Sequence, residues 1–524
     1  MTNPLGDALA AGRFCYVVEL VASRRKREAQ LFEIASGLAR LPEVVAAGIT
    51  NYAGGAMGHD PLRIAVGALA RGLTPNVHLT CVGQDRQGLR KTLEEMHALS
   101  LENVLALTGD YPKTGDRPPV FDLDSVQLVR LIDEMRRGGM DFNIGVAVSP
   151  FKYSEIDCVY QYLKLEKKIE AGADVAITQV GWDARKFEEL KRYLDRRELH
   201  TPLLGNVYVL DLKTAERMAK GGPPGCWVSP ELLGAVRAER QEKDGGRHAR
   251  LDRAARTVAL LRGLDYAGAY IGGIHDSDQI SWIIRRAEEL VPQWKELAAE
   301  LQYGAPGGFY LYDRPAWADA DAPHRTAPPS PTAPKDRPRR ELVPRILDLL
   351  GRTFPVRRDT RLRRTLTSIF AWIEGRPRLA AAFERAELAL KKPLFGCQAC
   401  GNCVLGHMEY VCPQTCPKQL RNGPCGGTHR GQCEVIPDNQ CIWVKVYQRA
   451  KEAGEVESLK VYIPPPNREL QGTSSFINFF LERDSLSAPL NRDRRRGARD
   501  NDRIGMAQHR PSSGSSSSSS APFE

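Results

Sequence analysis

Short apolar runs of strand length alternate with longer segments of helical period over residues 14–290. The runs cover Phe14–Val21, Val44–Thr50, Asn76–Cys81, Asn103–Thr108, Asn143–Ser149, Ala173–Gln179, Leu203–Val209 and Ala267–Ile274. Strands that alternate with helices pair in parallel, because each helical crossover returns the chain to the same end of the sheet. Eight such units predict a closed α/β structure, the (β/α)8 TIM barrel. An open doubly wound sheet is the alternative, but no Gly-x-Gly-x-x-Gly turn follows the first run.

The remaining sequence divides by composition. We expect the barrel to occupy residues 1–305 and a linker rich in Pro and Ala to follow over 306–341. Helical periodicity returns after residue 342, and a dense group of cysteines then leads to residue 470. We therefore predict a small helical, cysteine-rich metal-binding domain over 342–470. Residues 471–524, which end in a serine run, are expected to form a disordered Arg/Ser-rich tail.

The net charge of +10 is concentrated outside these domains. Residues 335–345 and 491–503 each contribute about +3, in the predicted linker and tail. We interpret them as solvated flexible chain and expect no nucleic-acid partner, with a basic interaction patch as the alternative. No uninterrupted apolar stretch reaches the length of a membrane span, and residues 1–13 lack the order of a secretory signal. The cytoplasm is the expected location.

Eight of the twelve cysteines fall within 45 residues, with the spacing C-x2-C-x2-C-x8-C-x3-C-x8-C-x7-C-x7-C. They are Cys397, Cys400, Cys403, Cys412, Cys416, Cys425, Cys433 and Cys441. In a reducing compartment such density indicates metal rather than disulfides. Two [4Fe–4S] clusters, one cluster with a zinc ion, or two zinc sites all fit eight thiolates. The C-x2-C-x2-C run favours iron–sulfur, and zinc remains the alternative, as does a metal module that only braces the barrel.

Polar residues stand at the end of every predicted strand, where the catalytic loops of a β/α barrel converge. They are Glu19, Thr50, His78, Thr108 to Asp110, Ser149, Gln179, Asn206 and His275. Glu19 interrupts the apolar run YVVELVA, and an unpaired carboxylate there costs several kcal/mol. Glu19 is therefore either a proton carrier with a raised pKa or a salt-bridged structural residue. Asp110 alone fits a helix cap equally well, and His78 alone fits a satisfied core histidine.

Four segments resemble methylenetetrahydrofolate reductases: YVVEL, NVHLTC, NVLALTGDYP and LEKKIEAGADVAITQ, which occur in the family's order across residues 14–290. The resemblance implies FAD across the carboxyl ends of the strands, with FMN as the alternative, and folate stacked on the flavin ring. The cysteine segments FGCQACGNC, CPQTCPK and NGPCGG are similar to a C-terminal domain found with some members, including those of acetogenic bacteria. There it resembles an electron-delivering or accessory subunit.

The resemblance also implies roles for individual residues. Glu19 matches the general acid that opens the five-membered ring of the folate, and Asp110 matches the carboxylate beside flavin and substrate. Gln179 matches a substrate-contacting amide, and His275 is expected to bind substrate as well. The expected cofactor contacts are Thr50, Ala53, His78, Thr108, Gly109, Asp110 and Lys168. Lys168 would face the cofactor's phosphates as a point charge.

The expected function is that of an oxidoreductase acting on CH–NH donors, which reduces 5,10-methylenetetrahydrofolate to 5-methyltetrahydrofolate in one-carbon and methionine metabolism. Electrons would come from NAD(P)H, or through the cysteine domain from a ferredoxin-like donor. Several positions depart from the family pattern: Leu20 to Ser23 replace its Phe-Phe-Pro-Pro, and Thr108 replaces an arginine. Ser149 and Tyr153 stand where a flavin-contacting tyrosine and histidine are usual. These changes leave the flavin form and direct use of NADH open. The alternatives are a folate-binding methyl-transfer partner and an accessory scaffold with structural zinc; a homo-oligomer also stays open.

Overall fold

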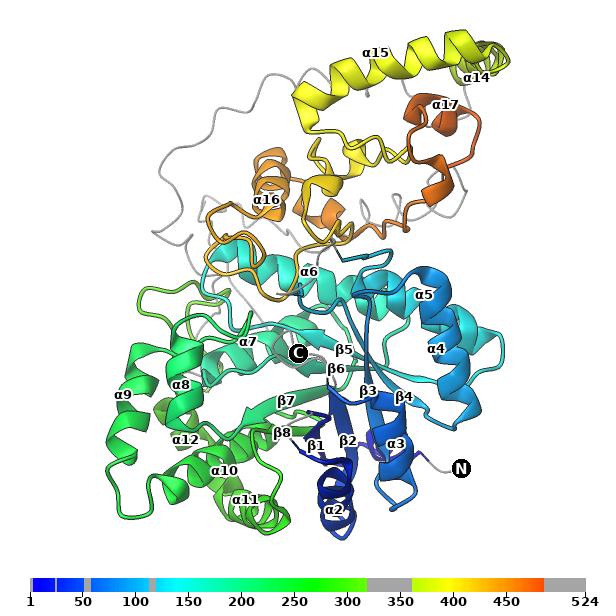
Figure 1. Ribbon diagram of the computed structural model, residues 1–524. Helices are drawn as coiled ribbons and strands as arrows, with labels where there is room; N and C mark the ends of the chain where they lie inside the picture. The colour runs from blue at the N-terminus through cyan, green and yellow to red at the C-terminus, as the bar shows by residue number, and fades with distance from the viewer. Residues whose placement is uncertain (1–2, 24–25, 51–57, 113–118, 318–360, 485–524) are drawn as a thin grey trace, which may run out of the picture.

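The computed structural model describes residues 3–23, 26–50, 58–112, 119–317 and 361–484 (Figure 1). Eight parallel strands pair in chain order, and the first pairs with the last, so the sheet closes into a barrel. The strands are β1 (Cys15–Val21), β2 (Val44–Thr50), β3 (Pro75–Thr80), β4 (Asn103–Leu107), β5 (Asn143–Val148), β6 (Val175–Thr178), β7 (Leu203–Tyr208) and β8 (Gly268–Gly272). The predicted TIM barrel is confirmed, with each predicted strand present and its ends shifted by at most two residues.

Helices follow the strands and cover the barrel. They are α2 (Glu28–Leu38), α3 (Pro61–Leu69), α4 (Arg86–Ala98), α5 (Ser125–Arg137), α6 (Glu155–Ala171), α7 (Ala184–Arg196), α8 (Leu212–Ala219), α9 (Pro230–Glu239), α10 (Arg247–Gly263), α11 (Ser277–Leu290) and α12 (Trp294–Glu300). Aspartates start many of them: Asp85, Asp183 and Asp276 each accept a bond from a free backbone N–H of the first turn. Such caps let a helix begin within a few residues of a strand.

The barrel interior is a packed apolar core that is closed at one end. Helix α1 (Pro4–Ala10) contributes Leu5 and Ala8 to the same buried cluster as Val17, Leu105 and Leu204 from the strands. The amino ends of the strands are therefore plugged by α1, a helix that the sequence pattern does not indicate. The carboxyl ends are left for ligands and chemistry, as in other barrels of this type.

The C-terminal region contains α14 (Arg361–Glu374), α15 (Pro377–Phe395), α16 (Ile442–Ala453) and α17 (Ser475–Phe480), joined largely by loops that carry the cysteines. In Figure 1 it lies over α6 of the barrel, with α15 farthest away. Helix α17 begins after residue 470, inside the expected tail, because Ile477 and Phe480 pack with Phe370 in an apolar cluster. Residues 342–360 and 485–524 of the expected segments lie outside the described residues.

The first residues of the expected linker pack on the barrel, and the rest of it, residues 318–341, lies outside the described residues. Phe309 and Tyr312 are buried, and the Tyr310 hydroxyl donates to Asp183 Oδ2 over 2.8 Å. Three aromatic side chains within four residues hold this segment on the barrel surface beside α7. Among the described residues, none of the helices combines the length and the apolar composition needed to cross a bilayer.

Hydrogen bonds to backbone groups join the cysteine-rich region to the barrel. Asp124, which is buried, accepts from the backbone N–H groups of Arg421 and Asn422 over 3.2 and 3.0 Å, and from Asn422 Nδ2 over 3.0 Å. From α6, Gln161 donates to the Cys425 carbonyl over 3.0 Å and Lys164 to the Pro424 carbonyl over 2.8 Å. The loop 421–428 is thus held against α5 and α6 near the carboxyl ends of the strands.

Candidate functional site

Glu19 lies near the carboxyl end of β1, beside the end of β8. A β-carbon at Gly272 would lie 3.1 Å from Glu19 Oε2, so the carboxyl group occupies space that a side chain on β8 would take. Burial raises the pKa of Glu19, and the backbone N–H of Gly273, which donates to the carboxylate, offsets part of that rise. The side chain therefore holds its proton to a higher pH than an exposed glutamate, as a general acid requires.

A chain of polar contacts crosses the mouth from β2 to β8. Thr50 Oγ1 lies 2.7 Å from His78 Nδ1, and the Tyr270 hydroxyl lies 3.3 Å from His78 Nε2. Burial lowers the pKa of His78 to about 4, so the ring is neutral at physiological pH. Gly48 makes room for this contact, because a β-carbon there would lie 2.1 Å from the Tyr270 hydroxyl oxygen. Sequence reasoning missed Tyr270; its polar ring inside the run GAYIG was the available signal.

Asp110 follows a tight turn after β4. Thr108 Oγ1 accepts from the backbone N–H of Ser125 over 3.2 Å, which ties the strand end to α5. Gly109 has a φ of +89°, and a β-carbon there would approach Val82 Cγ1 to 2.9 Å, so the turn requires glycine. The half-buried Asp110 side chain comes next.

Glu19 and Asp110 act electrostatically on the same thiol. Burial raises the pKa of Cys226 to about 12, Lys152 lowers it, and the charges of Asp110 and Glu19 raise it further. Cys226 lies in the loop between α8 and α9, at the same end of the barrel. Glu19 and Asp110 are thus both within electrostatic range of Cys226.

The other expected residues are distributed around this region. Gln179 Nε2 would lie 3.4 Å from a β-carbon on Gly225, next to Cys226. Lys168 is buried between α6 and β5, where its ammonium donates to the Ala147 carbonyl over 2.5 Å and burial lowers its pKa to about 7. Its role toward cofactor phosphates stays a prediction. Ala53 lies outside the described residues.

Three buried polar atoms in or just beyond β5, β7 and β8 make no hydrogen bond within the described part of the chain. They are Ser149 Oγ, Asn206 Oδ1 and His275 Nε2. A buried polar atom without a partner costs about 1–3 kcal/mol, so such atoms typically pair with water or a bound molecule. A bound polar molecule at this end of the barrel would give these three atoms their partners.

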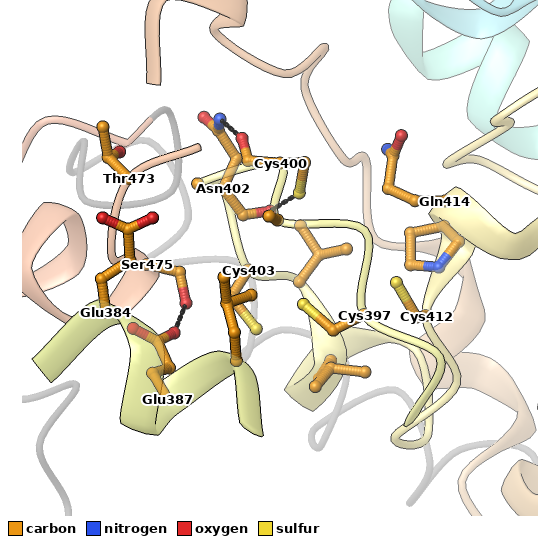
Figure 2. A pocket seen from close by; sticks show the side chains of 16 residues that line it. Glu384, Glu387, Cys397, Cys400, Asn402, Cys403, Cys412, Gln414, Thr473 and Ser475 are labelled. Atoms are coloured by element: carbon orange, nitrogen blue, oxygen red, sulfur yellow. Dashed lines mark hydrogen bonds between the residues drawn. The ribbon is translucent and has the colours of Figure 1, made fainter. Parts of the chain in front are cut away.

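The first four cysteines of the C-terminal region surround one pocket between α15 and the following loop. Cys397, Cys400, Cys403 and Cys412 line it, together with Glu387 and Asn402 (Figure 2). Lys391 Nζ lies 3.8 Å from Cys403 Sγ, and Arg421 Nη2 lies 3.7 Å from Cys400 Sγ. Two buried cations therefore lie beside these thiols. We call the four cysteines Cys397, Cys400, Cys403 and Cys412 the outer group.

The last four cysteines, which we call the inner group, lie nearer the barrel. Burial raises the pKa of Cys441 to about 12, and the charges of Cys416 and Cys433 raise it further. The charge of Cys416 likewise raises the pKa of Cys425, after larger effects of burial and Glu434. Among the described residues, no three or more His, Cys, Asp or Glu side chains form a set that could hold a metal ion. A donor set made only of thiols nevertheless has the chemistry that iron–sulfur clusters and zinc select.

Both parts of the chain match known families. Residues 5–251 match the family described as methylenetetrahydrofolate reductase, and residues 377–469 match the one described as the C terminal of methylene-tetrahydrofolate reductase. The 5,10-methylenetetrahydrofolate reductase of Pectobacterium carotovorum is 32% identical over 126 residues, which cover 24% of this chain and 39% of that protein. Methylenetetrahydrofolate reductase 2 of Schizosaccharomyces pombe is 24% identical over 251 residues, 43% of this chain and 37% of that protein. The matched parts thus span well under half the length of these relatives.

A solved structure with 12% sequence identity and a TM-score of 0.41 covers 55% of this chain and 99% of its own. It is described as an uncharacterized protein from Clostridium thermocellum that binds two copies of 5-methyl-5,6,7,8-tetrahydrofolic acid. The two family matches follow one another in the chain: the first covers the barrel as far as α10, and the second covers most of the cysteine-rich region. This chain belongs to the methylenetetrahydrofolate reductase family.

Proposed function

We propose that this protein reduces 5,10-methylenetetrahydrofolate to 5-methyltetrahydrofolate with a bound flavin. The observation that carries the proposal is the Glu19 carboxyl group at the barrel mouth, with a pKa raised by burial. Its proton would go to the nitrogen that leaves the methylene carbon when the five-membered ring of the folate opens. The resulting carbon–nitrogen double bond accepts a hydride. A bound reduced flavin, FAD or FMN, would supply that hydride when present.

The other residues of the mouth would bind and orient. Thr50, His78, Thr108 and Gly109 would hold the flavin, and Gln179 would hold the folate. Asp110 would lie beside both. The neutral His78 offers one donor and one acceptor nitrogen, and its contacts with Thr50 and Tyr270 fix the plane of its ring. The polar atoms of Ser149, Asn206 and His275 that lack partners in the described part would gain them from the bound molecules.

The cysteine-rich region would hold metal in two groups of four thiolates, as iron–sulfur clusters or as zinc. Electrons would reach the flavin from NAD(P)H, or through clusters in this region from a ferredoxin-like donor. All twelve cysteines are free thiols, which suits a reducing compartment such as the cytoplasm. Iron, sulfide and zinc analysis of protein purified without oxygen distinguishes the two metals, and zinc alone would remove the electron-transfer role.

The test of the proposed reaction compares Glu19→Gln with a matched control, Glu43→Gln, whose exposed carboxylate lies just before β2 at the opposite end of the barrel. Single-turnover oxidation of chemically reduced flavin by the folate is followed by absorbance. We expect Glu19→Gln to slow the step by about 100-fold or more while flavin content stays unchanged, since a positioned acid contributes about 10²–10⁴-fold. Equal rates in the two variants would show that Glu19 is not the acid.

A further inference from the structure

The cysteine-rich region places a charged pair in the barrel mouth. Lys418 and Glu434 form an ion pair whose side chains are only 2% and 4% exposed. The Lys418 ammonium also donates to the Gly109 carbonyl over 2.8 Å. Gly109 is the residue before Asp110, and its carbonyl belongs to the peptide unit that joins the two. A side chain from outside the barrel therefore holds the backbone from which the Asp110 carboxylate projects.

A second contact lies across the mouth, on the side of Gln179. The Gly426 carbonyl accepts from Lys152 Nζ over 2.7 Å, and Lys152 is buried at the start of the segment that leads from β5 to α6. A β-carbon on Gly225 would lie 2.8 Å from the Gly426 oxygen and 3.4 Å from Gln179 Nε2. Gly426 of the loop and the expected substrate amide thus lie on either side of Gly225, while Lys418 contacts the turn before Asp110.

These contacts alternate with the inner group of cysteines along the chain. Lys418 follows Cys416 by two residues, Gly426 follows Cys425, and Glu434 follows Cys433. There is no room for a side chain at Gly427, because a β-carbon would meet Pro224 Cβ at 2.8 Å and a Glu434 carboxylate oxygen still closer. The segment is therefore packed tightly against the loop of the barrel that carries Cys226.

We infer that residues 416–434 form one wall of the folate site and that Lys418 is a positioning residue for Asp110. The inference rests on the proposed function and deepens it, because it makes the folate site a composite of the barrel and the cysteine-rich region. Lys418 acts through the Gly109 peptide and does not itself react. Displacing a site group by about 1 Å can lower a rate by about 100-fold, so a lysine that fixes this peptide has a measurable effect on turnover.

Removing Lys418 alone would leave the Glu434 charge buried without its partner, which strongly destabilises the region. The test variant is therefore Lys418→Met with Glu434→Gln, which removes both charges. The matched control is Lys451→Met, because Lys451 also joins the cysteine-rich region to the barrel, through Glu155, but is 49% exposed and lies in the last turn of α16. Full-length protein with its cofactors is used throughout.

We expect the double variant to bind 5-methyltetrahydrofolate about tenfold more weakly by calorimetry and to lose about 100-fold in kcat/KM. Flavin content, metal content and unfolding midpoint should match those of the control. Adding Asp110→Asn to the double variant should lower kcat/KM by much less than Asp110→Asn does in the wild-type protein, because both changes act on one group. Full additivity, or a folate Kd within twofold of the control, would overturn the inference.

The outcomes separate this inference from the proposed function. If the wild-type protein reduces methylenetetrahydrofolate and the double variant does so equally well, the proposed function is supported and the composite folate site is refuted. If the wild-type protein binds flavin but reduces no folate, the proposed function is refuted. The positioning role of Lys418 is then tested by the flavin midpoint potential of the double variant, because a displaced Asp110 carboxylate shifts that potential. A potential equal to that of the Lys451→Met control would overturn the positioning role.

Discussion

Asp124 has two separate structural roles, and replacing it with alanine removes both. Its Oδ1 atom caps α5 by accepting from the backbone N–H groups of Val126 and Gln127 over 3.0 and 3.1 Å. Its Oδ2 atom accepts three bonds from Arg421 and Asn422 of the cysteine-rich region, each between 3.0 and 3.2 Å. One carboxylate therefore starts a barrel helix and holds the loop that leads to the inner cysteine group.

The loss in free energy of unfolding that we expect for Asp124→Ala follows from these bonds. A lost N-cap costs about 1 kcal/mol. Each of the three donors from the loop is buried, and a buried donor left without an acceptor costs about 1–3 kcal/mol. We expect Asp124→Ala to lower the free energy of unfolding by about 5 kcal/mol. Asp124→Asn should retain most of the cap, but its NH2 group would face the three donors of the loop and cannot accept from them. This variant should therefore lose most of the stability that Asp124→Ala loses.

The assay is a urea titration followed by circular dichroism, together with limited proteolysis of the cysteine-rich region. Asp85→Ala is the matched control, because Asp85 caps α4 through Gly88 over 2.7 Å at an exposed position. It should lose about 1 kcal/mol and leave proteolysis unchanged. If Asp124→Ala and Asp85→Ala differed by less than 1 kcal/mol, the bonds across the two regions would not stabilise the native protein as we argue.

Three further predictions concern the barrel mouth and the metal sites. Because burial raises the folded pKa of Glu19, ionising it costs stability as pH rises, so Glu19→Gln should raise the unfolding free energy at pH 8. That gain should vanish near the unfolded pKa of about 4.3, and a gain independent of pH would contradict the assignment. Gly48→Ala should weaken flavin binding at least about tenfold in a fluorescence titration, because its β-carbon would meet the tyrosine hydroxyl of β8 at 2.1 Å. Gly234→Ala, which meets nothing within 4 Å, should bind flavin normally. Cys397→Ser and Cys425→Ser should each lose about half of the bound metal on elemental analysis, and loss of all metal in either would show that the two groups are not separate sites.

Local pattern was sufficient for the eight strands of the barrel and for helices such as α6. The helix at Glu155–Ala171 has a core-facing set at helical spacing, and the eight strands are apolar runs buried on both faces, so each is recognisable from a short window. Glu19 was recognisable for the same reason, since a carboxyl group inside an apolar strand needs an explanation. The ends of the linker and tail were less predictable, because α17 and the aromatic segment around Phe309 are ordered by distant partners.

Which cysteines line a common pocket was decided only by the tertiary structure, as was which residues of the cysteine-rich region contact the barrel. Spacing alone allowed any of several pairings, because a loop of given length reaches many positions. Lys418 and Gly109 are 309 residues apart, and Asp124 and Asn422 are 298 apart, so no local pattern links them. Periodicity records whether a side chain faces a core; which distant backbone group a buried lysine or aspartate meets depends on how whole elements pack.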